Sequence, residues 1–189
     1  MSVSAVRAYN AFVSVLALAA LAMAVALLFV PSVRVRVRNT FSSTELLSGA
    51  AVVAAVATAG SLTYSEVVGF VPCFLCWVQR GFMYPLVIIA AWAGRASRRS
   101  ERVWLAPFVV AAGGFMVSVW HYLEQTIPGL SIGACEVGVP CGAKYVNQFG
   151  FVSIPFMAGC GFLLIMGLAL TARRSTGQPA RRSTAEITS

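Results

Sequence analysis

The chain has 189 residues, of which 59% are hydrophobic and only 11% are charged, and its mean hydropathy is +0.82. A soluble domain of this length has too little interior to bury so much apolar surface, so the composition excludes a soluble globular protein and indicates an integral membrane protein. The formal net charge of +8 does not require nucleic acid as a partner, because arginines held beside anionic lipid headgroups account for it.

Five apolar runs are each long enough to cross a hydrocarbon core of about 30 Å as a helix. In chain order they cover residues 9–30, 46–69, 77–94, 103–122 and 151–171. A membrane-spanning segment must satisfy its own backbone hydrogen bonds, and these runs lack the period-two alternation of barrel strands. We therefore predict an all-α integral membrane protein with five spanning helices.

The first run has an alternative interpretation as a cleaved signal peptide. Arg7 precedes its apolar part, and Ala22, Met23 and Ala24 have the small-residue pattern of a cleavage site. The run, however, continues past that site to the length of a membrane span. Cleavage would also leave the basic residues that follow it on the outer side, against the distribution expected of membrane proteins. A transmembrane helix is therefore the favoured interpretation.

Basic residues are concentrated in alternate connections between the runs. Eleven of the fourteen lysines and arginines follow the first, third and fifth runs: Arg34, Arg36, Arg38, Arg95, Arg98, Arg99, Arg102, Arg173, Arg174, Arg181 and Arg182. Because basic residues are retained in short cytoplasmic loops, the N-terminus is predicted outside and the C-terminus inside. The tail of residues 172–189, rich in Arg, Ser and Thr, is predicted to be disordered.

A Cys-x-x-Cys pair, Cys73 and Cys76, lies at the start of the third run, directly after Pro72. A thiol reacts as its thiolate, and a helix N-terminus or a nearby cation lowers the pKa of a thiol. Arg80 follows Cys76 by four residues and is expected on the same helical face. Its guanidinium could stabilise a thiolate at Cys76 or hold a carbonyl oxygen of an electron acceptor; an interfacial arginine that reaches for headgroups is the alternative.

A second pair, Cys135 and Cys141, lies in a Gly- and Pro-rich loop between the fourth and fifth runs. The charge distribution places both pairs on the outer side, where dithiol–disulfide exchange between them would be possible. Passive structural disulfides and a zinc site of four cysteines are the alternatives, although an exposed thiolate cluster outside the cytoplasm would tend to oxidise. His121 is either an interfacial hydrogen-bonding residue or a proton donor or acceptor for a reducible headgroup. Cys160 is predicted to be an inert, small apolar residue.

Three segments together carry a resemblance to a known family. They read Pro-Cys-Phe-Leu-Cys-Trp-Val-Gln-Arg-Gly-Phe-Met-Tyr-Pro at residues 72–85, His-Tyr-Leu-Glu-Gln at residues 121–125 and Cys-Gly-Ala-Lys-Tyr-Val-Asn-Gln-Phe-Gly-Phe-Val-Ser-Ile-Pro-Phe at residues 141–156. Over residues 46–170 the chain resembles the disulfide bond formation protein B family, DsbB and its Gram-positive relative BdbC. The resemblance implies a four-helix transmembrane bundle, to which the helix of residues 9–30 is an addition. The expected organisation is residues 1–45 (extra helix and Arg-rich loop), 46–171 (redox bundle) and 172–189 (tail).

The resemblance also implies an activity, which is thiol:quinone oxidoreduction in a bacterial cell membrane in support of protein disulfide bond formation. Cys135 and Cys141 would form the loop pair, with Cys135 meeting an extracytoplasmic thioredoxin-like thiol oxidase similar to DsbA or BdbD. The expected cofactor is a membrane quinone, either ubiquinone or menaquinone. No metal and no nucleic acid are expected.

The remaining site residues match the quinone side of the family. By resemblance, Cys73 and Cys76 form the quinone-proximal pair, with Cys76 as the thiolate that contacts the quinone. Arg80 and His121 would both lie at the quinone. A vitamin K epoxide reductase-like protein is the alternative enzyme, although there the loop pair precedes the Cys-x-x-Cys. A membrane protein with purely structural disulfides is the non-enzymatic alternative.

Overall fold

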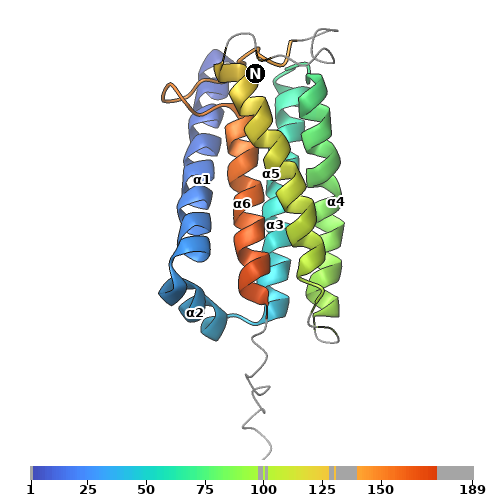
Figure 1. Cartoon of the computed structure of the whole chain (residues 1–189). Coiled ribbons are helices and arrows are strands. Elements are labelled where there is room, and N and C mark those ends of the chain that lie inside the picture. The colour runs from blue at the N-terminus through green and yellow to red at the C-terminus, as the bar shows by residue number, and fades with distance from the viewer. Residues whose placement is uncertain (1, 98–99, 101, 128–129, 131–139, 174–189) are drawn as a thin grey trace, which may run out of the picture.

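The computed structural model describes residues 2–97, 100, 102–127, 130 and 140–173. Over these ranges the chain is almost entirely helical (Figure 1). The elements are α1 (Val3–Phe29), α2 (Pro31–Thr40), α3 (Ser43–Leu62), the π-helical turn η1 (Thr63–Val67), α4 (Phe74–Ala96), α5 (Leu105–Thr126) and α6 (Ile154–Ala172). The predicted tail lies outside the described residues from residue 174 onward.

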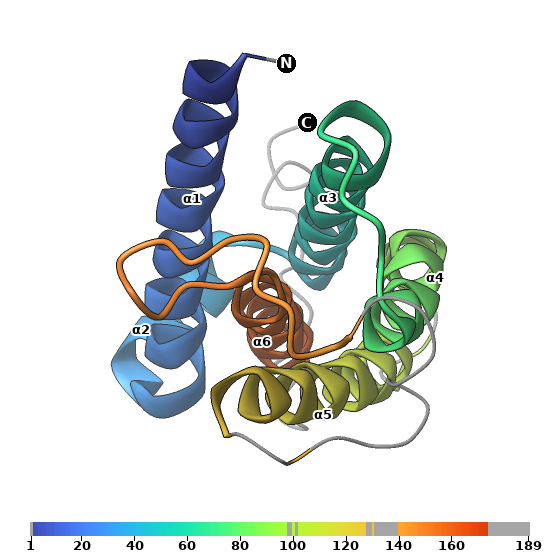
Figure 2. The same ribbon diagram turned by 90° about the horizontal axis from the view of Figure 1, so that it is seen from above.

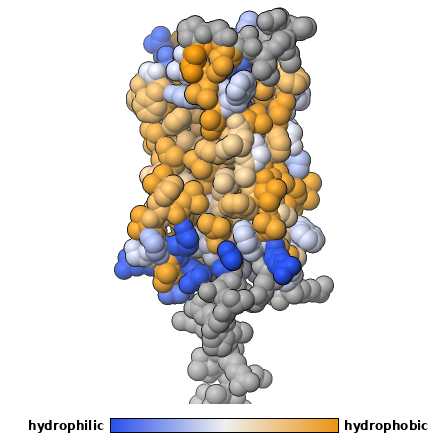
Figure 3. Space-filling view, viewed as in Figure 1, coloured by the Kyte–Doolittle hydropathy of each residue, from blue (hydrophilic) through white to orange (hydrophobic). Residues whose placement is uncertain are grey.

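Five of these helices are long and apolar enough to cross a membrane, namely α1, α3 continued through η1, α4, α5 and α6. The prediction of five spanning helices is confirmed, and the chain is a multi-pass membrane protein. Figure 3 shows the broad apolar band over the middle of the molecule and hydrophilic residues gathered at its lower end. Several helices begin earlier than the apolar runs, because polar capping residues lie outside the apolar part: Ser2 caps α1, and Ser42 caps α3 in a capping box with Glu45.

Four helices form the bundle, in which α3 packs on α4, α4 on α5, α5 on α6, and α6 again on α3. α1 lies outside this bundle and packs mainly against α6 (Figure 2). Close approach of α5 and α6 depends on Gly114, since a Cβ there would lie 2.3 Å from the ring of Phe162. Phe162 is fully buried at the centre of the core, together with Met83 and Leu86 of α4.

α1 passes through the Ala22–Ala24 segment as one uninterrupted helix, and Ala24 is fully buried. A Cβ on Gly167 of α6 would lie 3.2 Å from the Cβ of Leu27, so the two helices are in close contact here. The helix is therefore continuous and packed against α6 through this segment, in keeping with the predicted transmembrane helix.

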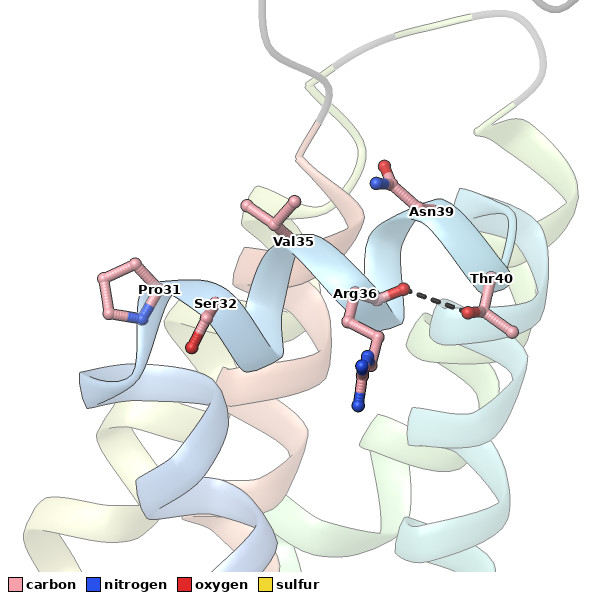
Figure 4. Close-up of a pocket in the computed structure, with 6 residues that line it drawn as sticks. All are labelled: Pro31, Ser32, Val35, Arg36, Asn39 and Thr40. Atoms are coloured by element: carbon pink, nitrogen blue, oxygen red, sulfur yellow. Dashed lines mark hydrogen bonds between the residues drawn. The ribbon is translucent and has the colours of Figure 1, made fainter.

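The Arg-rich connection after α1, expected as a loop, contains the ten-residue helix α2. Pro31 occupies the first turn, where its missing N–H costs nothing. The Arg34 side chain donates to the carbonyl oxygens of Leu27 (2.8 Å) and Leu28 (2.5 Å), and so satisfies the open end of α1. Figure 4 shows the shallow hollow on the outer face of α2, where Thr40 donates to the carbonyl oxygen of Arg36 at 3.0 Å.

Most of the described basic residues lie at one end of the bundle, and the described cysteines of the two pairs lie at the other. α2, the end of α4 and the end of α6 bring the described arginines Arg34, Arg36, Arg38, Arg95 and Arg173 to the lower end in Figure 1. The start of α4, the end of α5 and the loop before α6 lie at the upper end. Cys73, Cys76 and Cys141 are therefore at one end, as the sequence predicts.

Candidate active site

The Cys-x-x-Cys pair is built into the N-terminus of α4. Cys73 is the N-cap residue, and its sulfur accepts a hydrogen bond from the backbone N–H of Cys76 at 3.3 Å. The two sulfurs are in contact at 2.7 Å, and both residues are free thiols. Cys73 is buried, whereas Cys76 is partly exposed. The pair thus has an inner sulfur at the cap and an outer sulfur one turn into the helix.

His121 of α5 joins this pair to the second cysteine loop. Its Nε2 lies 3.6 Å from the sulfur of Cys73 and 3.2 Å from the carbonyl oxygen of Cys141. Because a carbonyl oxygen only accepts, the hydrogen is on Nε2, which points toward both cysteines. Nδ1 is buried and has no hydrogen-bond partner among the described residues. His121 is 1% exposed, so it is a buried residue of the site and not an interfacial one.

The loop that carries Cys141 folds onto the Cys-x-x-Cys pair. Cys141 is 1% exposed and packs in one cluster with Cys73 and Leu75. It is disulfide-bonded. Cys135, its predicted partner, lies outside the described residues, so that pairing stays a prediction. One helical turn beyond His121, Gln125 donates to the carbonyl oxygen of Ala143 at 3.3 Å, so α5 holds the loop at two points.

Hydrogen bonding lowers the pKa of the Cys73 thiol to about 4. The largest cause is the hydrogen bond between the side chains of Cys73 and Cys76, and the contact with His121 acts in the same direction. Burial opposes the shift, because it disfavours a charged sulfur. The hydrogen bonds outweigh burial, so the thiolate form of Cys73 is favoured when the pair is reduced.

A small pocket lies beside the Cys-x-x-Cys pair, under the loop that carries Cys141. It encloses about 10 Å³, roughly the room of one water molecule. Its lining includes Cys73, Cys76, His121, Gln125, Pro140, Ala143, Tyr145, Val146, Ile154 and Pro155. A quinone ring is far larger than this space, so the pocket suits thiol exchange and proton movement, and a quinone would have to approach Cys76 from another side.

Arg80 lies one turn beyond Cys76 and points toward α3. Its Nε and Nη2 donate to the side chain and the carbonyl oxygen of Ser61, both at 3.0 Å, and its guanidinium lies 5.1 Å from the ring centre of Trp77. Arg80 is only 8% exposed, so it does not reach out to headgroups. Among the described residues Nη1 makes no hydrogen bond, which leaves a donor for a carbonyl oxygen of an acceptor. Arg80, Trp77 and Cys76 therefore fit a quinone.

The same atoms allow a test of the zinc alternative. Ligand atoms of Cys73, Cys76 and His121 lie within 4.8 Å of one another. Two sulfurs bound to tetrahedral zinc at about 2.3 Å would be roughly 3.8 Å apart. The observed 2.7 Å is too short for that arrangement and suits two sulfurs that form and break a bond. Cys160 is buried within α6 as a free thiol, in keeping with its predicted passive role.

Residues from three elements support the site without having been predicted from the sequence. Ser61 anchors Arg80, Gln125 anchors the loop, and Tyr145 closes one side of the pocket. Gln125 could have been found, because it follows His121 by four residues and shares its helical face. Ser61 could not have been found, because the sequence does not show which face of α3 packs against α4.

Comparison with known proteins identifies the same region. The family model described as "Disulfide bond formation protein DsbB" matches residues 43–172, from the start of α3 to the end of α6. The match leaves α1 and α2 outside and includes all the described site residues. No solved structure gives a significant match to the chain.

Three curated relatives agree with this match. A "Probable disulfide formation protein" of Oceanobacillus iheyensis is 48% identical over 128 residues, covering 66% of this chain and 86% of the relative. "Disulfide bond formation protein C" of Bacillus subtilis is 46% identical over 116 residues, covering 61% and 83%. A "Probable disulfide formation protein C" of Halalkalibacterium halodurans is 41% identical over 122 residues, covering 64% and 88%.

Proposed function

This chain belongs to the disulfide bond formation protein DsbB family of membrane disulfide oxidoreductases, and from that premise we propose that it carries electrons from an extracytoplasmic thiol oxidase to a membrane quinone through its two cysteine pairs. The observation that carries the proposal is the position of His121, whose Nε2 contacts both Cys73 and the backbone of Cys141. Cys141 and Cys73 also pack in one cluster, which supports direct exchange between their sulfurs.

The first step is oxidation of the partner. A thiolate of a reduced thioredoxin-like oxidase attacks the sulfur of Cys135, the Cys135–Cys141 bond breaks, and Cys141 leaves as a thiolate. The second partner thiol then attacks the mixed disulfide, so the partner leaves oxidised and the loop pair is a dithiol. Burial of Cys141 supports Cys135 as the point of entry, because the partner cannot reach a sulfur that is packed against Cys73.

The second step passes the two electrons inward. The Cys141 thiolate attacks the sulfur of Cys73, and Cys76 leaves as a thiolate. Cys135 then attacks Cys141, which restores the loop disulfide and releases Cys73. A sulfur with a low pKa is a good leaving group, so the lowered pKa of Cys73 favours this release. His121 stabilises the charge through its Nε2–H, at 3.6 Å from that sulfur.

The third step returns the inner pair to the disulfide. When bound, a membrane quinone would supply the acceptor for two electrons and two protons. Arg80 would donate a hydrogen bond to it, Trp77 would contact its ring, and Cys76 is the partly exposed sulfur on that side. Cys73 and Cys76 would close their disulfide as the pair gives up two electrons to this acceptor, and the proton of Cys76 and one from solvent would complete the balance. His121 remains a candidate for quinone contact through Nδ1.

The reaction belongs on the extracytoplasmic face of a bacterial cell membrane. The described arginines at the opposite end of the bundle support this orientation, since basic ends remain in the cytoplasm. An oxidising compartment also suits a protein that supplies disulfides.

The proposal is tested with the purified protein in lipid nanodiscs, a reduced thioredoxin-like oxidase and either ubiquinone or menaquinone. Replacing both Cys73 and Cys76 by serine should abolish quinone reduction, while Cys135 still forms a mixed disulfide with the partner. Arg80→Gln should raise the quinone KM and leave partner binding unchanged. Cys160→Ser is the matched control, because it removes a buried thiol outside the site. Quinone reduction by the double serine variant would disprove the relay.

A further inference from the structure

α1 has contacts that the matched family region does not account for. It precedes the match, which begins at residue 43. Near the cysteine end its side chains reach past α6 to the end of α3. Tyr9 donates from its hydroxyl to the carbonyl oxygen of Gly60 at 3.3 Å, and Asn10 accepts a hydrogen bond from the Tyr64 hydroxyl at 3.0 Å. Two consecutive residues of α1 are thus bonded to the segment that leads into the Cys-x-x-Cys pair.

From this point a series of ring contacts leads to the cysteine loop. The ring of Tyr9 meets that of Tyr64 edge-on at 5.2 Å, Tyr64 stacks on Phe70 at 5.8 Å, and Phe70 stacks on Tyr145 at 4.7 Å. We call Tyr9, Tyr64, Phe70 and Tyr145 the aromatic chain. Its last member, Tyr145, lines the pocket beside Cys73 and Cys76. Figure 2 shows the segment after Cys141, in orange, lying over the upper ends of α1 and α6.

The backbone of η1 and of the residues after it positions the rings of Tyr64 and Phe70 for stacking. The π-helical turn runs from Thr63 to Val67, and the chain leaves it through Gly69, at φ 85°, a conformation that glycine adopts without strain. The N–H of Phe70 then donates to the carbonyl oxygen of Tyr64 at 2.9 Å. This bond brings the rings of Tyr64 and Phe70 to within 8° of parallel. Tyr64 is buried and hydrogen-bonded to Asn10, so α1 holds one end of this stack in place.

We propose that α1 positions the loop that carries Cys141, acting through the aromatic chain to keep Cys141 against Cys73. The inference rests on the proposed relay and adds a role for the helix outside the matched region. Tyr9 and Asn10 are positioning residues, because they act on the loop only through Tyr64. Loss of the contacts that Tyr9 and Asn10 make would allow the loop to move away from Cys73. Exchange between the pairs would then be slower, while the chemistry at either pair would be unaffected.

The first test measures loop motion by hydrogen exchange and does not depend on electron transfer. The full chain in nanodiscs is compared with Tyr9→Leu, which removes the first ring. The amides of Ala143, Gln148 and Val152, all hydrogen-bonded within the loop, should exchange about 3- to 10-fold faster in the variant, the range set by the loss of one aromatic contact. Phe12→Leu is the matched control, because Phe12 lies on the same helix and is 61% exposed. Equal exchange in both variants would overturn the proposal.

The second test separates positioning from general loss of stability. Single-turnover transfer from the reduced loop pair to the inner disulfide should slow by a similar factor in Tyr9→Leu, whereas quinone reduction by a pre-reduced inner pair should be unchanged. Tyr9→Phe keeps the ring and should restore the rate. A loss of both steps would mean a structural role only, and would contradict the proposal. If the wild-type protein shows no transfer between pairs, the relay fails, while the hydrogen-exchange result still decides the role of α1.

A double-mutant cycle provides a milder alternative to Tyr9→Leu should that variant not fold. Asn10→Ala and Tyr64→Phe each remove one partner of the same hydrogen bond. If α1 acts through this bond, each single change and the double change should accelerate loop exchange equally. Additive effects would show that Tyr64 supports the loop independently of α1, and would overturn the proposal.

Discussion

Cys73 has two functions in one residue, since its sulfur caps α4 and takes part in exchange. As the N-cap it accepts the N–H of Cys76, at the end of the helix where backbone donors favour a negative charge. The same sulfur contacts Cys76 and His121. The hydrogen-bonding neighbours that fix its position, Cys76 and His121, therefore also stabilise its thiolate, whereas burial opposes it.

The pH dependence of alkylation at Cys73 tests this account. In the reduced protein the rate with iodoacetamide, followed at Cys73 by peptide mass spectrometry, should fall as pH drops through about 4. Above that value the thiolate is already formed, so the rate should be flat up to about pH 8. Cys76→Ala removes the largest cause of the low pKa and should move the midpoint upward, further than His121→Phe does. Cys76→Ser retains a hydroxyl donor and serves as the control. An unchanged midpoint in Cys76→Ala would refute the assignment.

At the scale of the helices, the bundle depends on glycine where two spans meet. Gly114 allows the ring of Phe162 to lie directly against the α5 backbone. The apolar run predicts that α5 spans the membrane, but not which of its faces meets α6. Packing in membranes is governed by small residues that let backbones approach, and two adjacent glycines, Gly113 and Gly114, are a recognisable signal of such a contact.

Gly114→Ala should therefore destabilise the fold. The added methyl group would lie 2.3 Å from the ring of Phe162, which is fully buried in the core. We expect a cost of about 1–3 kcal/mol, typical of overpacking a core. Unfolding by dodecyl sulfate, monitored by circular dichroism, measures it. Gly81→Ala in α4 is the control, because a Cβ there meets nothing within 4 Å. Equal stability of the two variants would mean that Gly114 is not a packing position.

Over the whole molecule, the sequence predicts elements better than the contacts between them. The lengths of the apolar runs alone are enough to predict five membrane spans, because the bilayer thickness sets the minimum length of each helix. The Cys-x-x-Cys spacing and the preceding proline place the pair at a helix start. The contact of Arg80 with Ser61 was not predictable, because it depends on the rotation of α3 relative to α4. The stack of Phe70 on Tyr145 was not predictable either, because it depends on a π-helical turn that no residue pattern predicts. The domain boundaries of 1–45, 46–171 and 172–189 stay a prediction.

The orientation of the molecule determines whether the relay can operate. The end of the bundle with α2 carries Arg34, Arg36 and Arg38, while Cys73, Cys76 and Cys141 lie at the other end. Moving a cluster of arginines across the membrane is costly, so the cysteine end should be translocated and the arginine end retained. Only that orientation places the loop pair in an oxidising compartment, where the disulfides it makes can persist.

Single cysteines placed at the two ends test this orientation in cells. In a background with the five native cysteines replaced by serine, Glu66→Cys adds an exposed thiol at the cysteine end and Asn39→Cys adds one at the arginine end. A membrane-impermeant maleimide should label Glu66→Cys in intact cells, and should label Asn39→Cys only after the membrane is opened. The arginines are unchanged in both variants, so the native orientation is retained. The reverse pattern would place both pairs in the reducing cytoplasm, where thiols are kept reduced, and would rule out the proposed flow of electrons from an extracytoplasmic partner to the quinone.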